Sequence, residues 1–442
     1  MSHDSIDHFL SDLKSQGITL LADGDTLRVS APKNSMTATI RQQVAERKNE
    51  VLAFLRQKNA ATKILAPVAD HSVQDAPLSY AQQRLKYLDQ LSHASLAATS
   101  DEHSIEMWPC PGDYRIYDEI LYQAMTQDQI RNDNYWQAIQ HLVQDKVVVD
   151  IGTGQDVVMG RLCIQAGAKK VYAIEVSEEA SNKAKLFMAE LGLAERIVVL
   201  HGDALSVQLP ELADVSVSEL IGVIGSSEGV VPILNDGRRF LKPDGIVIPQ
   251  QCVTKVAAVR LPEPFADQPR FSPMAYYYVE KIFQHIGYPF DLRLAIKNLP
   301  AEQIVSTEAV FEELNFQIQL EPEWQREITL TVTQAGRIDG LLLWLELSTM
   351  QGAMINSLTQ AVSWLPVYFP VFQPSILVNP GDRIQFTNHT FFSANRINPD
   401  YSLKGAILQA DGNRTPFEYR SCLYDRSFKQ SLFYEKLFAS KP

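Results

Sequence analysis

The sequence predicts an α/β domain with a parallel sheet, followed by a mainly antiparallel β domain and preceded by a small α/β unit. From about 106 to 249, apolar strand-like runs alternate with helical segments, which is the pattern of a parallel sheet. From 250 to 442, short β-rich runs dominate, namely QCVTKVAAVRL, REITLTVTQ, GLLLWLELST and DRIQFTN, with one helix around Met274 to His285. Residues 1–60 form a separate pattern of helix, hairpin and helix.

Composition narrows the class of protein. The 442 residues carry a net charge of −12 and a 45% apolar share, which is typical of a globular chain with several cores. An acidic chain repels polyphosphate, so we expect no nucleic-acid partner. The four cysteines lack metal-ligand spacing, and no histidines cluster as ligands would, so no metal is implied. The charged N-terminus has no long apolar run, so we expect no membrane anchor and a cytoplasmic protein.

Residues 1–60 hold the first predicted elements in chain order. Ile6, Phe9, Leu10 and Leu13 have helical spacing, and Gly17 follows as a cap. Strand-like runs at 18–22 and 26–31 flank the turn residues Asp-Gly-Asp, which predicts a hairpin. Apolar residues between 40 and 55 then predict further helix. By itself, a unit this small is a solubilising appendage.

Residues 61–105 are rich in Ala, Ser, Pro, Asp and His and lack a sustained period, so we interpret them as a linker. Within them, residues 76–91 read APLSYAQQRLKYLDQL, which predicts an amphipathic helix.

The α/β segment carries a glycine-rich turn. Residues 146–154 (KVVVDIGTG) predict a buried strand that runs into Gly152 and Gly154, after which Val157 to Ala166 form a helix. Glycines allow the backbone to approach a ligand there, and the N-terminus of the following helix is electropositive.

Two further strand ends complete a nucleoside site. A strand from Lys170 to Ile174 ends at Glu175, and an acidic residue there accepts hydrogen bonds from both ribose hydroxyls. A strand from Ile197 to Leu200 leads to Asp203 and Ala204, where an adenine would be bracketed. A nicotinamide dehydrogenase is the competing interpretation, but its third turn glycine is missing.

The segments VVDIGTG, AGAKKVYAIEVS, VSELIGVIGSSEG and FLKPDGIVIPQQ resemble the protein arginine methyltransferases in order and spacing. The resemblance spans about 106–442. It implies a Rossmann-like methyltransferase domain, a β-barrel-like substrate and dimerisation domain, S-adenosyl-L-methionine as cofactor and a homodimer. The cofactor residues that it implies, besides the turn and strand-end residues above, are Met125, Arg131, Asp150 and Glu219.

The resemblance also assigns the acceptor side. Glu219 and Glu228, after a fourth strand at Val215 to Val217, match the paired glutamates that hold a guanidinium, and they are the catalytic candidates. The substrate candidates are Tyr122, Ser363 and Trp364. The sequence departs from the family in three places: one extra residue between the glycine turn and Glu175, Asp156 where the family has glycine, and Ser363 where it has histidine.

Residues 1–60 resemble the TubC-type docking domains of nonribosomal peptide synthetase and polyketide assembly lines, through GITLLADGDTLRVSAP and KNEVLAFLRQ. Residues 76–91 look like a remnant of a condensation domain, whose HHxxxDG signature is absent. Together these resemblances imply a methyltransferase that tailors a free or carrier-bound intermediate or building block, with a synthetase protein as partner. A guanidino or amine nitrogen is the expected acceptor. The alternatives are an O-methyltransferase, a protein arginine methyltransferase and a catalytically silent docking adaptor.

Overall fold

The computed structural model describes residues 19–23, 26–30 and 104–439, and the single residues 37, 40, 44, 47, 48 and 51. The chain divides into two compact units, Met1–Pro67 and Val68–Pro442. In the part that the structure describes, no helix has the length and apolar character needed to cross a membrane.

The first unit contains the predicted hairpin. Strands β1 (Thr19–Asp23) and β2 (Thr26–Ser30) pair antiparallel, with Asp23 opposite Thr26 at the turn. Val51 donates a 2.9 Å hydrogen bond to the carbonyl of Arg47, four residues earlier, as in a helix. The predicted helix at residues 6–13 and the segment 76–91 lie outside the described residues.

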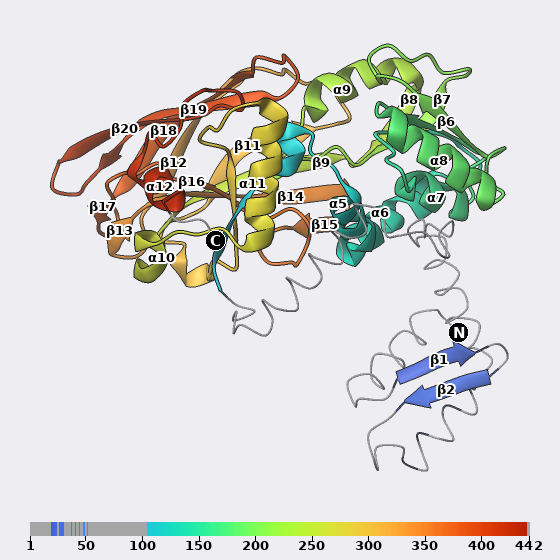
Figure 1. The fold of residues 1–442 in the computed structure, drawn as a ribbon, viewed down its shortest axis with the longest axis horizontal. Coiled ribbons are helices and arrows are strands. Elements are labelled where there is room, and N and C mark those ends of the chain that lie inside the picture. The colour runs from blue at the N-terminus through green and yellow to red at the C-terminus, as the bar shows by residue number, and fades with distance from the viewer. Residues whose placement is uncertain are drawn as a thin grey trace. The chain divides into compact units, whose positions relative to one another are not determined.

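A five-stranded parallel sheet organises the α/β domain and confirms the predicted α/β class (Figure 1). Its strand order is β6-β5-β4-β7-β8, and each neighbouring pair is parallel. The strands are β4 (Val147–Ile151), β5 (Lys170–Glu175), β6 (Ile197–His201), β7 (Ala213–Ser218) and β8 (Leu241–Ile248). All five residues of β4 are buried, as its unbroken apolar run predicts for a central strand.

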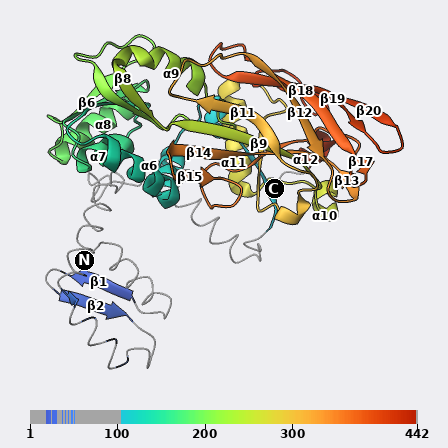
Figure 2. The same ribbon diagram turned by 180° about the vertical axis from the view of Figure 1, so that it is seen from behind.

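The helices of this domain are α5 (Glu119–Gln127), α6 (Gln129–Leu142), α7 (Val158–Gln165), α8 (Glu178–Glu190) and α9 (Val230–Gly237). Three of them begin at a side-chain cap. Asp118, Asp128 and Ser177 accept hydrogen bonds from backbone N–H groups in the first turns of α5, α6 and α8. Helix α6 contacts both α7 and the β domain, so α5 and α6 lie between the two domains (Figures 1 and 2).

The β domain contains a seven-stranded and a four-stranded antiparallel sheet and has the predicted barrel-like form. The larger sheet has the order β11-β9-β14-β16-β10-β3, with β15 on β14. Its strands are β3 (Glu106–Pro109), β9 (Gln251–Val259), β10 (Leu294–Lys297), β11 (Ala309–Asn315), β14 (Gly340–Met350), β15 (Ala353–Asn356) and β16 (Val367–Phe369). The smaller sheet comprises β12 (Trp324–Thr331), β18 (Arg383–Phe392), β19 (Pro399–Leu408) and β20 (Arg414–Ser421). Strands β13 (Gly336–Ile338) and β17 (Ile376–Val378) form a separate pair.

Both faces of the larger sheet are covered. Leu341 and Leu343 of β14 pack in the core shared with the smaller sheet, whereas Leu342 and Trp344 face a second core. This second core includes residues of α11 (Pro273–Ile286) and α12 (Leu432–Leu437). A strand that is buried on both faces explains the continuous apolar run GLLLWLELST. Two short elements, α10 (Glu263–Asp267) and the 3-10 helix η3 (Ala301–Gln303), complete the connections between β9 and β11.

Strand β3 joins the β domain from upstream of the α/β domain. It pairs antiparallel with β10, so that Met107 lies opposite Ile296. The 3-10 helix η1 (Pro111–Tyr114) follows it and leads to α5. The limits 106–249 and 250–442 stay our proposal for the two domains, with β3 as a strand that the first segment contributes to the sheet of the second.

Candidate functional site

Three strand ends named from the sequence meet at one edge of the parallel sheet. Because the strands are parallel, their carboxyl ends lie on the same side. Strand β4 lies between β5 and β7, where the strand order reverses, and such a reversal opens a crevice for ligands. The glycine turn after β4, Glu175 at the end of β5 and Glu219 after β7 are therefore neighbours.

The glycine turn has the conformation that its sequence predicts. Gly152 and Gly154 have φ values of +76° and +67°, in the left-handed region that favours glycine. A Cβ atom on Gly152 would also lie 2.5 Å from a methyl carbon of Leu220. Gly154 donates its N–H to Oε2 of Glu175 at 2.9 Å, so the turn and the second strand end are in direct contact.

Asp150 shapes this turn from within. Its Oδ2 accepts hydrogen bonds from the Thr153 hydroxyl at 2.6 Å and from the Gly160 N–H at 3.0 Å. Burial raises the pKa of Asp150 to about 7, and these two hydrogen bonds oppose the rise. Asp150 thus fixes the backbone on which a cofactor would lie.

The nucleoside side of the crevice combines a buried carboxylate with an exposed apolar side chain. Glu175 is buried, and its Oε1 accepts the N–H of Ser177 at 2.8 Å. The next residue, Val176, is 62% exposed. An apolar side chain left open beside the Glu175 carboxylate offers a surface on which a flat base can pack, and the sequence reasoning missed it.

Asp203 and Ala204 follow β6 at the same edge of the sheet. The exposed Asp203 carboxylate accepts the N–H of Leu205 at 2.9 Å. The carbonyl of Ala204 accepts a 2.7 Å hydrogen bond from Arg239, which fixes this loop against the end of α9. The loop is therefore held in shape next to Glu175.

Helix α5 covers the glycine turn. A Cβ atom on Gly154 would lie 3.3 Å from the ring of Tyr122, which places this tyrosine over the turn. The Thr126 hydroxyl donates to Oδ2 of Asp156 at 3.1 Å. The family departure at Asp156 therefore has a structural role, because this buried carboxylate ties the turn to α5.

Arg131 and Glu219 form an ion pair at the entrance of the acceptor side. Nη1 of Arg131 lies 2.8 Å from Oε2 of Glu219, and the arginine side chain is 3% exposed. Its Nη2 donates to the carbonyl of Met125. Burial raises the pKa of Glu219 to about 7, with Arg131 opposing the rise and Asp128 and Asp150 adding to it. The structure therefore brings both cofactor candidates, Met125 and Arg131, to the first catalytic candidate.

Glu228 has a different environment. Its Oε2 accepts a 2.5 Å hydrogen bond from the hydroxyl of Tyr117, whose ring centroid lies 6.1 Å from that of Tyr122. Burial raises the pKa of Glu228 to about 8, the carboxylates of Asp113 and Glu219 add to the rise, and the Tyr117 hydrogen bond opposes it. Because the charge of Glu219 raises the pKa of Glu228, the two carboxylates lie near enough to interact, and they face the same region.

The β domain holds the segment between the two glutamates. Nε1 of the buried Trp364 donates to the carbonyl of Ile221 at 2.7 Å. The backbone N–H of Ser363 donates to Oδ2 of Asp128 at 2.8 Å. Because Ser363 makes this contact through its backbone, the loop reaches α6 without the histidine of the family.

Sequence reasoning named residues on both sides of the crevice and missed some of their partners. The structure brings together the glycine turn, Glu175, Arg131, Met125, Glu219 and, over the turn, Tyr122. It adds Tyr117 as the partner of Glu228 and Asp128 as the partner of Ser363. The signal for Asp128 was available, since it caps α6 directly before Arg131.

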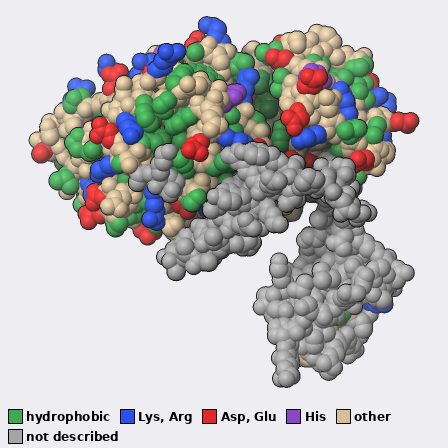
Figure 3. Space-filling model, viewed as in Figure 1, with side chains coloured by type: hydrophobic (Ala, Val, Ile, Leu, Met, Phe, Trp, Pro, Cys, Tyr) green, Lys and Arg blue, Asp and Glu red, His purple; other side chains and the backbone are tan. Residues whose placement is uncertain are grey.

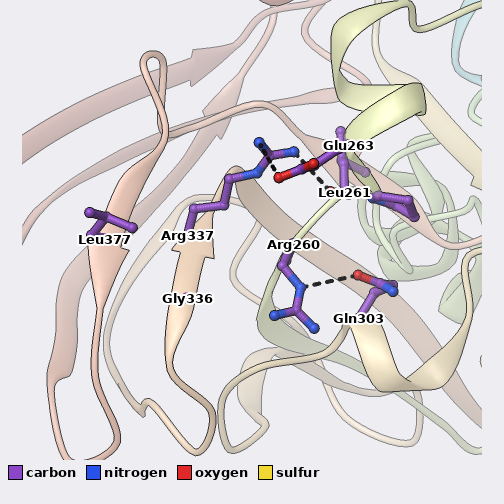
Figure 4. A pocket seen from close by; sticks show the side chains of 8 residues that line it. Arg260, Leu261, Glu263, Gln303, Gly336, Arg337 and Leu377 are labelled. Atoms are coloured by element: carbon purple, nitrogen blue, oxygen red, sulfur yellow. Dashed lines mark hydrogen bonds and ion pairs between the residues drawn. The ribbon is translucent and has the colours of Figure 1, made fainter.

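A pocket in the β domain is lined in part by Gly336 and Arg337 of β13 and by Leu377 of β17 (Figure 4). These two strands lie at the end of the β domain away from the parallel sheet (Figure 1). The volume of the pocket is about 430 Å³, and Arg260 and Arg337 are among its lining residues. Both guanidinium groups already have partners, namely Gln303 at 3.3 Å and Glu263 at 3.8 Å. None of the predicted site residues lines it. Elsewhere on the face in Figure 3, acidic and basic side chains are interspersed.

Two known families match parts of the chain. Residues 6–57 match the family described as the TubC N-terminal docking domain, and residues 149–248 match the one described as a methyltransferase domain. The second match begins in β4 and ends with β8, so it covers the parallel sheet.

Curated relatives that match part of the chain are described as arginine methyltransferases. An Arabidopsis thaliana protein described as "Probable protein arginine N-methyltransferase 6" is 33% identical over 150 residues, which cover 33% of this chain and 34% of the relative. For the first three relatives, the matched part spans 34%, 39% and 38% of their length. The chain thus spans little more than a third of the length of each of these relatives.

Solved structures extend the likeness to the β domain. Protein arginine methyltransferase 10 of Arabidopsis thaliana has a TM-score of 0.57 at 21% identity, with 70% of this chain and 98% of that chain covered. The PRMT1 enzyme-prozyme heterotetrameric complex of Trypanosoma brucei with AdoHcy also has a TM-score of 0.57, at 19% identity over 70% and 99%. These comparisons show the fold, a Rossmann-like domain followed by a β-barrel-like domain. The family match identifies the α/β domain as a methyltransferase domain.

Proposed function

We propose that this chain, which carries an S-adenosylmethionine-dependent methyltransferase domain, methylates a cationic nitrogen, guanidino or amine, on a small molecule of an assembly-line pathway. The observation that carries this proposal is the environment of Glu228. Its carboxylate is partly buried, has a pKa raised to about 8 and, within residues 104–439, receives its hydrogen bond from the neutral hydroxyl of Tyr117.

The charges around the acceptor side favour a cation. Glu219 is paired with Arg131, and Asp113 is paired with Arg293, at 2.8 Å each. Of these three carboxylates, Glu228 is thus the one that has no ion-pair partner among the described residues. A buried carboxylate is stabilised by a cation that also donates hydrogen bonds to it, and a guanidinium does both.

The residues at the sheet edge fit the cofactor. The glycine turn allows the backbone to come close to the cofactor, and Glu175 suits the ribose hydroxyls. Val176 with Asp203 and Ala204 suits the adenine. Met125 suits the sulfonium region, and Arg131 suits the carboxylate end. S-adenosylmethionine supplies an electrophilic methyl group on sulfur. The protein then has to orient the acceptor nitrogen and remove its proton, and Glu228, with a pKa of about 8, suits both tasks.

The N-terminal unit supports an assembly-line setting. Residues 6–57 match the docking family, and the β1–β2 hairpin presents strand edges that a partner's terminal segment can extend. We propose a nonribosomal peptide synthetase or polyketide synthase protein as the partner, and we keep residues 76–91 as a condensation-domain remnant. A free or carrier-bound substrate, a cytoplasmic location and a homodimer are part of the same proposal.

A protein arginine methyltransferase is the second candidate, favoured by the curated relatives. The docking match then has no role, since a protein substrate needs no assembly-line partner. An O-methyltransferase would use one glutamate as base, and a silent adaptor would use neither.

The test replaces each glutamate by glutamine. Because each carboxylate acts on charge in the transition state, Glu219→Gln and Glu228→Gln should each lower turnover on the order of a hundredfold. Cofactor affinity should stay nearly unchanged in Glu228→Gln, since Glu219 alone of the two contacts Arg131. Product mass spectrometry with free arginine, agmatine and an arginyl-carrier thioester identifies the acceptor and gives the rates.

Glu190→Gln, at an exposed position of α8, is the matched control and should keep full turnover. Glu175→Ala should instead weaken cofactor binding. Wild-type turnover in both acceptor-side variants would show that the loop is structural, and a strong loss in one variant alone would favour the O-methyltransferase.

A further inference from the structure

Glu228 lies against a glycine of the segment that precedes the α/β domain. A Cβ atom on Gly112, in η1, would lie 2.1 Å from Oε1 and 2.5 Å from Cδ of Glu228. Gly112 does not have a positive φ, so its backbone is one that other residues adopt. Glycine is therefore needed here for space, since any side chain would enter the volume of the carboxylate.

Asp113, the residue after Gly112, holds the loop that carries Glu228 in place. Oδ1 of Asp113 accepts the hydroxyl of Ser227 at 2.7 Å, and Oδ2 pairs with Nη1 of Arg293 at 2.8 Å. Asp113 and Ser227 are fully buried, and the side chain of Arg293 is 1% exposed. An ion pair in such surroundings is rigid, because moving one member leaves the other charge unpaired.

Arg293 is in turn fixed by the β domain. Its Nε donates to Oγ of Ser421 at 3.1 Å, its Nη2 donates to the carbonyl of Pro399 at 3.3 Å, and its guanidinium lies 4.8 Å from the ring centroid of Tyr401. The β domain thus fixes Asp113, and Asp113 fixes Ser227.

The loop has a second anchor one residue earlier. Ser226 donates both its N–H and its hydroxyl to Glu312, at 2.8 Å and 2.7 Å. Asn398 donates to the carbonyl of Ser227 at 2.8 Å. Buried groups of the β domain therefore bind the two residues directly before Glu228.

We propose that Gly112, Asp113 and Ser227 are positioning residues that aim the carboxylate of Glu228 at the acceptor nitrogen. The inference rests on the proposed function of Glu228. Tyr117 holds Oε2, Gly112 leaves room for Oε1, and the Ser227–Asp113 hydrogen bond fixes the backbone between them. A displacement of about 1 Å at such a group costs on the order of a hundredfold in rate, so the anchor determines turnover.

Gly112→Ala is the first test. The new methyl group meets the end of a flexible side chain, so the protein should fold with a melting temperature close to wild type while Glu228 is displaced. We expect kcat to fall by about tenfold or more, because Glu228 is displaced from the acceptor. The cofactor affinity should be unchanged. The assay uses the acceptor from which the wild-type enzyme makes most product, out of arginine, agmatine and the arginyl-carrier thioester. Wild-type kcat in this variant would overturn the inference.

Ser227→Ala tests the anchor separately. Ser357→Ala is its matched control, because the Ser357 hydroxyl also makes one buried hydrogen bond, accepting the N–H of Leu345 at 2.9 Å, in the β domain and outside the site. Both variants should lose similar stability, but only Ser227→Ala should lose turnover.

A double-mutant cycle decides whether Ser227 acts through Glu228. In the Glu228→Gln background, Ser227→Ala should have no further effect on kcat, because the group that it positions has lost its charge. Losses that simply add would show a general structural role and overturn the inference. Full turnover of Glu228→Gln alone would instead overturn the proposed function of Glu228.

Discussion

Glu219 and Glu228 are the same residue type in one loop, yet their surroundings differ. Glu219 faces the guanidinium of Arg131, whereas Glu228 faces the hydroxyl of Tyr117 and the nearby charge of Asp113. Burial therefore raises the pKa of Glu219 to about 7 and that of Glu228 to about 8. The less compensated carboxylate is the one that a cationic acceptor would stabilise most.

This difference predicts a pH dependence. Since the pKa of Glu228 is raised, its neutral form predominates below about pH 8 and its carboxylate above it. A cationic acceptor needs the carboxylate, so kcat/KM for the acceptor should rise as the pH increases from 6 to 9. Steady-state rates across this range measure the effect.

The control for the pH dependence is Glu228→Gln. This variant should lose the limb of the profile near pH 8, whereas the exposed-site variant Glu190→Gln should retain it. An identical limb in Glu228→Gln would assign the titration to another group.

For single residues, the sequence predicts the features that depend on neighbouring positions in the chain. Gly152, Gly154 and Glu175 each follow a strand directly, so strand pattern and turn chemistry find them, and the structure places them in contact. Asp113 and Arg293 are 180 residues apart, and neither has a local pattern that indicates a buried pair. Such partners are defined by tertiary packing, which a single sequence does not record.

Among the elements, the segment between β7 and α9 depends on another domain for its shape. Trp364 reaches it from the β domain and satisfies the carbonyl of Ile221. A buried carbonyl that loses its donor costs about 1–3 kcal/mol. The indole is thus an anchor for the loop that carries both glutamates.

Trp364→Phe should therefore lower both stability and turnover, the latter roughly tenfold through loss of loop position. Trp344→Phe is the matched control, since Trp344 is fully buried and its Nε1 has no hydrogen-bond partner in the described part of the chain. That variant should lower the melting temperature through lost packing and leave turnover unchanged. Equal losses of turnover would mean that Trp364 acts only through packing.

The longer elements were predictable, and the shortest were not. Strand β4 has an unbroken apolar run and α11 has a serine cap, a first-turn proline and a final Gly287, so pattern and caps identify them. Strands β13 and β16 have three residues each, which is too short for a period to be seen. Their position depends on strands β17, β14 and β10.

For the whole molecule, the docking match predicts a separable function. Deletion of residues 1–60 should leave kcat for a free acceptor unchanged, because the described site lies within residues 104–439. Transfer should weaken only when the acceptor is presented by the partner protein, since the hairpin would bind that partner's terminal segment. Rates with free and carrier-bound acceptors, with and without the partner, measure both effects. A folded, cofactor-loaded truncation without any turnover would make the N-terminal unit part of the active site.

The pairing of Asp113 with Arg293, 180 residues later, also has a consequence for synthesis on the ribosome. Chains are synthesised at about 5–20 residues per second, so Arg293 is added roughly 10–40 s after Asp113. The parallel sheet, whose last strand β8 ends at Ile248, is complete before Arg293 has been made. During translation the crevice at the edge of the parallel sheet can thus form before the surroundings of Glu228 are complete, and these take their final shape only after the β domain has packed on η1.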